Sequence, residues 1–403
     1  MSCIFSSVWI KAYLCLPAVV GTFGVVLMGT ALVGSQPSDK PQRGKMPAEL
    51  LVYVGTYTKG ESRGIYVLRL DLQTGRLSEP ELAVEVGNPS FLAVHPSKRV
   101  LYAVSETSES RGRPSGSVSA FVIRDDGSLR PLSEQSSGGA GPCYVALDGT
   151  GSHVLVANYG GGSVTVLPIE EDGRLKPASA VVQHEGSSVD PKRQQEPHAH
   201  SINPDPSDRF ALAADLGIDR VLVYRFNAQT GTIVPHEPAG ARVAPGAGPR
   251  HLAFHPNGRI AYVINELRST VTAFTWVAAR GTLEELQTIS TLPADFTGSS
   301  YTADVQVHPS GRFVYGSNRG HDSMTIFAVD EASSRLSLVG HQSTGGKTPR
   351  HFGIDPTGSY LLAANQDSHS IVVFRIDQSS GQLTPTGARI EVPSPVCVRF
   401  VEP

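Results

Sequence analysis

The chain has few cysteines, 4 in 403 residues. Cys3 and Cys15 lie in an apolar N-terminal segment, whereas Cys143 and Cys397 are isolated, with no CxxC pair and no CxxCH motif. A covalently attached haem and a cysteine-based metal site are therefore disfavoured. We expect Cys143 and Cys397 to be packing residues and not to form a disulfide.

The chain also lacks an excess of either charge and any motif for a serine nucleophile. It carries 34 Lys and Arg against 37 Asp and Glu, a net charge of -3, so no nucleic-acid partner is expected. Without a GxSxG motif, an acyl-enzyme on a nucleophile elbow is disfavoured. What is abundant is turn-forming sequence: 41 Gly and 29 Pro favour short strands over long helices.

One long apolar run stands at the N-terminus. Between Lys11 and Asp39 the chain carries no charged residue, and a run of this length could serve as a signal peptide or span a bilayer. We expect residues 1–35 to be a signal peptide or membrane anchor and residues 36–49 to be a polar linker. Residues 50–403 then form the folded domain of an exported protein, periplasmic or extracellular, with any membrane contact confined to the N-terminal segment.

An internal repeat dominates the rest of the chain. A small residue or Pro is followed by an apolar strand, a turn such as HP or DP, and a second strand that ends in a small polar residue. Examples are GPCYVALDGTGSHVLVANY (141–159), GPRHLAFHPNGRIAYVINE (248–266) and TPRHFGIDPTGSYLLAANQD (348–367). The turns recur at positions 96, 149, 204, 256, 309 and 356. Alternating segments such as GSVTVLPIEEDGRLKPA stand between these copies, so each period holds four short strands, which is one propeller blade.

The two ends of the chain complement each other. The last copy, SPVCVRFVEP, supplies a single strand, and the N-terminal LLVYVGTYT and GIYVLRLDL can complete its blade. The sequence therefore predicts an all-β fold, a seven-bladed β-propeller of four-stranded blades. Pairing of the N- and C-terminal segments closes the ring and leaves no open sheet edge.

Corresponding positions of the blades should meet at one rim. The first strand of each blade lines the axis, and its start lies beside the end of the second strand, so these positions converge on a funnel. The position after the starting residue varies from blade to blade: Ser90, Cys143, His198, Arg250, Ala303, Arg350 and Val396. The position after the second strand holds Glu106, Tyr159, Glu266, Arg319 and Gln366. Because purely structural positions would resemble one another, this variation favours function.

A neighbouring column is more uniform. It holds Ser105, Asn158, Asn265, Asn318 and Asn365, with Asp215 at the same place in the third copy. Repetition of a short polar side chain is typical of a turn cap that bonds backbone groups. We interpret the asparagines as structural.

Two kinds of chemistry fit the charged positions. His198 and His200 form an HxH pair that could bind a metal beside Asp215 or Glu266, but three firm ligands cannot be identified and nearby arginines oppose a cation. We therefore expect no metal and no cofactor. Guanidinium groups converging on one funnel instead suit a carboxylate or phosphate. An ionised glutamate or a neutral histidine could then act as a base.

Three segments carry a family resemblance: PHAHSINPDPSDRFALAADLGIDRVLVYRF, GPRHLAFHPNGRIAYVINEL and SNRGHDSMTIF. Over about residues 50 to 403 the chain resembles the lactonase family of seven-bladed propellers, which includes bacterial 6-phosphogluconolactonases and carboxymuconate-lactonising enzymes. The resemblance implies a metal-independent site in the funnel. Its catalytic residues would be His200, Arg250, Glu266 and Arg319. Substrate contacts would come from His198, Asp215 and His351, and the rim argument adds Arg350.

We accordingly expect an enzyme that hydrolyses a sugar lactone, 6-phosphogluconolactone or a related aldonolactone, to the open-chain acid. Glu266 or His200 would take the proton of the attacking water, and the partner would be a small, anionic lactone bound by a monomer. Two alternatives stay open: a lactonising cycloisomerase of the muconate type, and a non-catalytic exported propeller that binds a ligand or partner.

Overall fold

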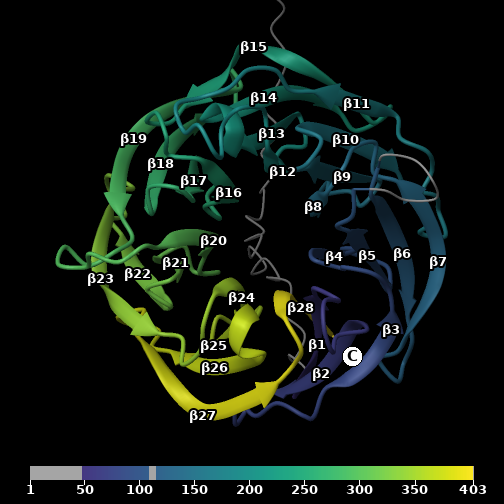
Figure 1. The fold of residues 1–403 in the computed structure, drawn as a ribbon, viewed down its shortest axis with the longest axis vertical. Coiled ribbons are helices and arrows are strands. Elements are labelled where there is room, and N and C mark those ends of the chain that lie inside the picture. The colour runs from purple at the N-terminus through teal and green to yellow at the C-terminus, as the bar shows by residue number, and fades with distance from the viewer. Residues whose placement is uncertain (1–47, 109–114, 403) are drawn as a thin grey trace, which may run out of the picture. The chain divides into compact units, whose positions relative to one another are not determined.

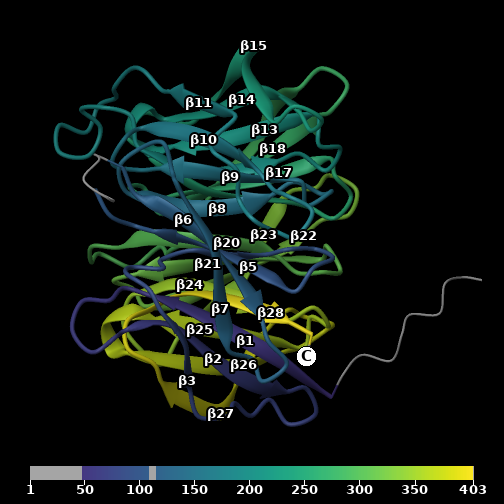
Figure 2. The same ribbon diagram turned by 90° about the vertical axis from the view of Figure 1, so that its right-hand side faces the viewer.

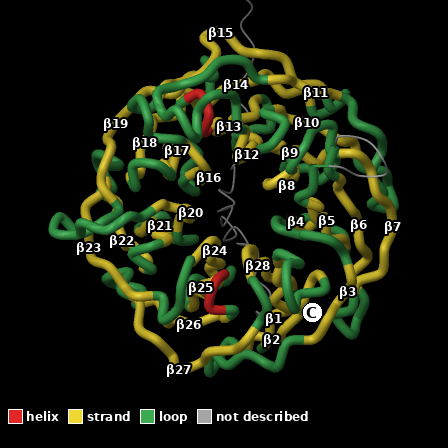
Figure 3. The backbone as a smooth tube through the Cα atoms, viewed as in Figure 1, coloured by secondary structure: helices red, strands yellow, loops and turns green. Residues whose placement is uncertain are grey.

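The computed structural model describes residues 48–108 and 115–402. The predicted signal or anchor segment and nearly all of the predicted linker lie outside these residues. The described residues belong to one compact unit. Within the described ranges, no helix is both long and apolar enough to cross a membrane. The helices there are two single turns, η1 (Leu216–Ile218) and η2 (Gln366–Ser368), each between the second and third strands of its blade (Figure 3).

The described strands form seven antiparallel sheets of four strands each, arranged as blades around a central axis (Figure 1). Three blades are β4 (Leu92–Val94), β5 (Val100–Ser105), β6 (Ser117–Ile123), β7 (Leu129–Ser136); β8 (Pro142–Leu147), β9 (His153–Asn158), β10 (Ser163–Pro168), β11 (Ala180–Gln183); and β12 (Ala199–Pro204), β13 (Phe210–Asp215), β14 (Arg220–Asn227), β15 (Thr232–Arg242).

Three more blades follow with the same strand order, and Figure 2 shows the ring from the side. They are β16 (Pro249–Phe254), β17 (Ile260–Asn265), β18 (Thr270–Val277), β19 (Thr282–Ser290); β20 (Tyr301–Val307), β21 (Phe313–Arg319), β22 (Ser323–Val329), β23 (Leu336–Ser343); and β24 (Pro349–Ile354), β25 (Tyr360–Asn365), β26 (Ser370–Ile376), β27 (Leu383–Glu391).

The last blade joins the two ends of the chain. Its inner strand is the C-terminal β28 (Pro395–Val401), followed outward by β1 (Glu49–Thr56), β2 (Gly64–Asp71) and β3 (Glu81–Glu85). Leu51 stands opposite Val401 in the ladder between β1 and β28. The predicted seven-bladed propeller, closed by pairing of the terminal segments, is confirmed.

Burial follows the position of a strand in its blade. The second strands β9, β13, β17 and β25 are buried at every residue, because both faces of each blade pack against neighbouring blades. The outermost strands, such as β11, alternate between partly buried and exposed residues. This explains why the second strands read as continuous apolar runs whereas the outer strands alternate.

The recurring HP turns connect neighbouring blades. Nε2 of His95 lies 2.9 Å from the carbonyl oxygen of Gly151 in the next blade, and His255 and His308 make the same contact, also at 2.9 Å, with the carbonyl oxygens of Gly311 and Gly358. The other ring nitrogen accepts from backbone N–H groups of its own turn, as Nδ1 of His95 does. These repeated histidines are therefore structural.

Candidate active site

In four blades, a β-bulge at the start of the inner strand places one side chain toward the axis. The register shifts between Pro249 and His251, so Arg250 is the extra residue. The same shift occurs in β8, β12 and β24, where the extra residues are Cys143, His200 and Arg350. A bulge re-aims the side chain of its extra residue. These four side chains meet in the funnel.

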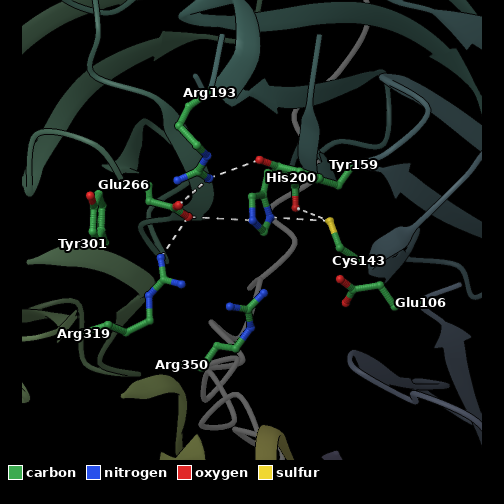
Figure 4. Close-up of a pocket in the computed structure, with 9 residues that line it drawn as sticks. All are labelled: Glu106, Cys143, Tyr159, Arg193, His200, Glu266, Tyr301, Arg319 and Arg350. Atoms are coloured by element: carbon green, nitrogen blue, oxygen red, sulfur yellow. Dashed lines mark hydrogen bonds and ion pairs between the residues drawn. The ribbon is translucent and has the colours of Figure 1, made fainter. Parts of the chain in front are cut away.

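A cavity of about 290 Å³ opens among them (Figure 4). Its lining includes three of the bulge residues and four residues at the ends of second strands or directly after them. The lining residues are Glu106, Cys143, Tyr159, Arg193, His200, Glu266, Tyr301, Arg319 and Arg350. Arg250 lines a narrower space that shares Cys143, His200 and Arg350 with this cavity. The structure thus brings the four predicted catalytic residues together and sets Arg350 beside them.

The third blade is two residues out of step with the repeat alignment. Ala199 pairs with Asp215 as Pro249 pairs with Asn265, so His200 corresponds to Arg250. The alignment that put His198 in that column was wrong, because this blade begins its inner strand two residues later. His198 lies before the strand, with its ring stacked on that of Tyr159 at a centroid distance of 4.4 Å.

Glu266 is the centre of the charged cluster. Its Oε2 atom lies 3.0 Å from Nε of Arg250 and 2.9 Å from a terminal nitrogen of Arg319. Arg193 reaches the other oxygen, Oε1, at 2.8 Å. The Glu266 side chain is 5% exposed, so these charge-assisted contacts form in a largely desolvated place, where they are strong.

The environment lowers the pKa values of both candidate bases, for different reasons. Burial alone would raise the pKa of Glu266, but the charges of Arg319 and Arg250 hold it well below its usual value. Burial and the charge of Arg250 lower the pKa of His200 well below 6.5. At neutral pH the pair is therefore an ionised carboxylate beside a neutral imidazole, with Nε2 of His200 3.9 Å from Oε2 of Glu266.

Cys143 contacts the other edge of the same imidazole. Its Sγ atom lies 3.5 Å from Nδ1 of His200 and 3.5 Å from the His200 carbonyl oxygen, to which the thiol can donate. Burial raises the pKa of the Cys143 thiol far above its ordinary value, so the thiol stays protonated and is a poor nucleophile. Cys143 and Cys397 are both buried and free, as predicted.

A second charged pair occupies the other side of the cavity. The guanidinium carbon of Arg350 lies 5.2 Å from the ring centre of Tyr57, a cation–π contact. The hydroxyl of Tyr57 donates to Oε2 of Glu106 at 3.0 Å. One aromatic side chain thus supports both a cation and an anion that line the cavity.

Besides His198, two more predicted substrate contacts are not among the residues that line the cavity. Asp215 is fully buried and caps η1: it accepts from the backbone N–H of Gly217 and of His198, and its Oδ2 lies 2.6 Å from Nδ1 of His184. His351 is buried in the wall, where its Nε2 lies 3.0 Å from a nitrogen of Arg399. Both residues shape the walls of the funnel.

Arg193 is one of two lining residues that sequence reasoning missed. It comes from the loop between β11 and β12, outside the repeated strands, and also donates to the hydroxyl of Tyr159 at 3.1 Å. No repeat column contains it, so periodicity offered no signal. Tyr301, 46% exposed at the first residue of β20, was missed because the repeat alignment began one residue later.

The asparagine column has the predicted structural role. Nδ2 of Asn158 donates to the carbonyl oxygen of Ser137, and Nδ2 of Asn318 donates to that of Thr291. Each amide thus bonds to the segment that enters its blade from the outermost strand of the preceding blade. Among residues 48–108 and 115–402, no group of three or more His, Cys, Asp or Glu side chains is arranged to hold a metal ion.

Comparison with known proteins agrees with the fold. The pattern of the family described as "Lactonase, 7-bladed beta-propeller" matches residues 51–400. A 6-phosphogluconolactonase of Bacillus subtilis is 40% identical over 350 residues, which are 87% of this chain and 97% of the relative.

Two solved structures are similar over most of their length. A putative 6-phosphogluconolactonase from Bacteroides fragilis has a TM-score of 0.82 at 40% identity, covering 88% of this chain and 98% of its own. The periplasmic gluconolactonase of Pseudomonas aeruginosa has a TM-score of 0.83 at 37% identity, covering 88% of this chain and 100% of its own. With a family match over nearly the whole propeller and relatives of this identity, the chain belongs to the lactonase family of seven-bladed β-propellers.

Proposed function

We propose that this lactonase opens the ring ester of an anionic sugar lactone, 6-phosphogluconolactone or a related aldonolactone, and releases the open-chain acid. The names of its relatives support the reaction class. The observation that carries the proposal is the pair of His200 and Glu266, a neutral imidazole beside an ionised carboxylate at one cavity. Neither the cycloisomerase nor the non-catalytic alternative is favoured by these relatives.

His200 is the general base in this proposal. The water oxygen bonds to the lactone carbonyl carbon as Nε2 of His200 takes the water proton. The negative charge of Glu266 stabilises the imidazolium that forms, and the contacts of Cys143 with the His200 backbone and Nδ1 hold the ring. When the tetrahedral intermediate collapses, the bond to the ring oxygen breaks and His200 returns the proton to that oxygen.

The arginines supply positive charge where the reaction develops negative charge. Four of them, Arg193, Arg250, Arg319 and Arg350, stand against Glu106 and Glu266 along the two connected spaces, so the lining has a surplus of two positive charges. Arg319, beside Glu266, is suited to stabilise the oxyanion. Arg193, with a side chain 36% exposed, is suited to hold a distal phosphate or carboxylate, and Arg250 orients Glu266.

We also infer that the protein acts outside the cytoplasm. The uncharged apolar run between Lys11 and Asp39 is typical of an export signal or anchor, and one similar structure is that of a periplasmic enzyme. The natural substrate would then be an extracytoplasmic aldonolactone, with or without phosphate. Cell fractionation of the full chain tests this: recovery with cytoplasmic markers alone would contradict export.

A panel of lactones tests the reaction. Purified protein is mixed with glucono-δ-lactone, its 6-phosphate and simple lactones, and proton release is followed. We expect turnover of sugar lactones by the native protein, and loss of turnover with ligand binding retained in Glu266→Gln. Sugar-lactone hydrolysis that is unchanged in Glu266→Gln would contradict the site, and the absence of hydrolysis in the native protein would contradict the function.

A further inference from the structure

The side of the cavity away from Arg193 carries two charged residues that have no role in the proton transfer between water and His200. Glu106 and Arg350 both line it (Figure 4). They come from different blades, since Glu106 follows β5 and Arg350 is the bulge residue of β24. A carboxylate here is unexpected in a cavity that otherwise attracts anions.

Tyr57 fixes both charged groups. It follows β1, so it belongs to the blade that closes the ring. Its ring lies under the guanidinium of Arg350, with 5.2 Å from guanidinium carbon to ring centre, and its hydroxyl holds Oε2 of Glu106 at 3.0 Å. The carboxylate and the guanidinium are therefore held in place before any ligand arrives.

The two charges do not satisfy each other. Among the interactions of residues 48–108 and 115–402, Arg350 and Glu106 form no ion pair within 4.0 Å, and the Arg350 guanidinium has no hydrogen-bond acceptor. Oε1 of Glu106 likewise has no donor within those ranges. A donor and an acceptor, both partly buried, thus line one cavity with bonding capacity left for a ligand.

The proximity of a guanidinium and a carboxylate indicates which ligand groups would fit between them. A phosphate or carboxylate would be attracted by Arg350 but repelled by Glu106. An ammonium group would be attracted by Glu106 but repelled by Arg350. A hydroxyl group accepts from a guanidinium and donates to a carboxylate at once. Adjacent hydroxyls on a sugar ring fit this arrangement best.

We propose that Glu106 and Arg350 form a hydroxyl-recognition subsite, and that Glu106 selects polyhydroxylated lactones over lactones without ring hydroxyls. The inference rests on the proposed lactonase function and adds the residue that determines specificity. The distal anionic group of the substrate then lies toward Arg193, away from Glu106. A site that hydrogen-bonds a substrate hydroxyl discriminates strongly against analogues without it, because its polar groups are left unpaired.

The test compares two substrates in four proteins. kcat/KM is measured for glucono-δ-lactone and for δ-valerolactone, which has no ring hydroxyls, with the native protein, Glu106→Gln, Tyr57→Phe and Glu81→Gln. We expect Glu106→Gln to lower kcat/KM for the gluconolactone by about 10-fold or more and to leave the valerolactone within about 3-fold. Tyr57→Phe should shift the ratio in the same direction but less, because only the orientation of Glu106 is lost. Glu81→Gln, the same charge change at an exposed outer-strand residue, should leave the ratio unchanged.

The outcomes separate the subsite from the reaction. Equal loss on both lactones in Glu106→Gln, or an unchanged ratio, would overturn the subsite. If the native protein hydrolyses neither lactone, the proposed function fails, and the subsite is then decided by calorimetric binding of gluconate. Weaker gluconate binding in Glu106→Gln but not in Glu81→Gln supports the subsite, and equal binding in both overturns it.

Discussion

Nε2 of His200 lies 3.9 Å from Oε2 of Glu266. That separation is too long for a hydrogen bond, so Nε2 of His200 is not hydrogen-bonded to the carboxylate and can accept a proton from water. It is short enough for the carboxylate charge to stabilise a proton arriving on that nitrogen. Glu266 is kept in this position by arginines on both of its oxygens. The arrangement separates the group that takes the proton from the group that compensates its charge.

This relationship predicts the acid limb of the pH–rate profile. Because the pKa of His200 is well below 6.5, the base is already deprotonated at pH 6.5. We expect kcat/KM for a sugar lactone to stay level from pH 7.5 down through pH 6.5 and to fall at lower pH. Initial rates in buffers of constant ionic strength measure this, and a limb centred at or above pH 6.5 would contradict the assignment of His200.

Removing the charge of Glu266 should destabilise the fold. Glu266→Gln leaves the guanidinium groups of Arg250 and Arg319 buried without a counter-charge, and breaking a buried pair in this way costs about 3–5 kcal/mol. We expect a clear drop in the urea midpoint. Arg193→Gln is the matched control, because its more exposed side chain lies at the edge of the cluster and its loss should cost less. Equal midpoints for Glu266→Gln and the native protein would contradict the cluster.

Buried neutral histidines should make the protein sensitive to acid. Burial lowers the pKa of His351 to about 3 and that of His251 well below 6.5. Between pH 6.5 and 3 the unfolded chain therefore binds protons that the folded chain does not, so the free energy of unfolding falls as pH falls. We expect urea midpoints at pH 7, 6, 5 and 4 to decline steeply below 6.5. In His351→Gln the free energy of unfolding should decline less steeply with falling pH, by about 1 kcal/mol per pH unit. The same slope in a folded His351→Gln variant would contradict the lowered pKa of His351.

The thiol of Cys143 should be unreactive in the folded protein. Burial raises the pKa of this thiol, and the thiolate is the form that alkylating agents attack. Iodoacetamide at pH 8 should label Cys143 only after unfolding, as read by peptide mass spectrometry, with activity unchanged in the folded sample. Rapid labelling of Cys143 in the folded protein, with loss of activity, would contradict this and would favour a mechanism in which the thiol is the nucleophile.

Some features of the site could be predicted from the repeat alone. Arg250 and Glu266 stand at the two positions that the blade pattern sends to one rim, and their contact confirms that reasoning. Asp215 shared a column with the asparagines and behaves like them as a local cap. Its assignment as a substrate contact came from the family resemblance, and periodicity had placed it correctly among structural residues.

The sequence by itself determined the seven-bladed ring, its closure and the set of unlike charged residues around the funnel. The reason is that the repeat marks each strand, the alternation of side chains marks its two faces, and equivalent strand ends of all blades lie on one rim. Beyond the contact of Arg250 with Glu266, tertiary structure decided which of those residues meet. The bulges selected His200 over His198, and a loop outside the repeat carried Arg193 onto Glu266. Contacts between segments so far apart in the chain depend on local register shifts and loop paths, and a periodic pattern contains neither.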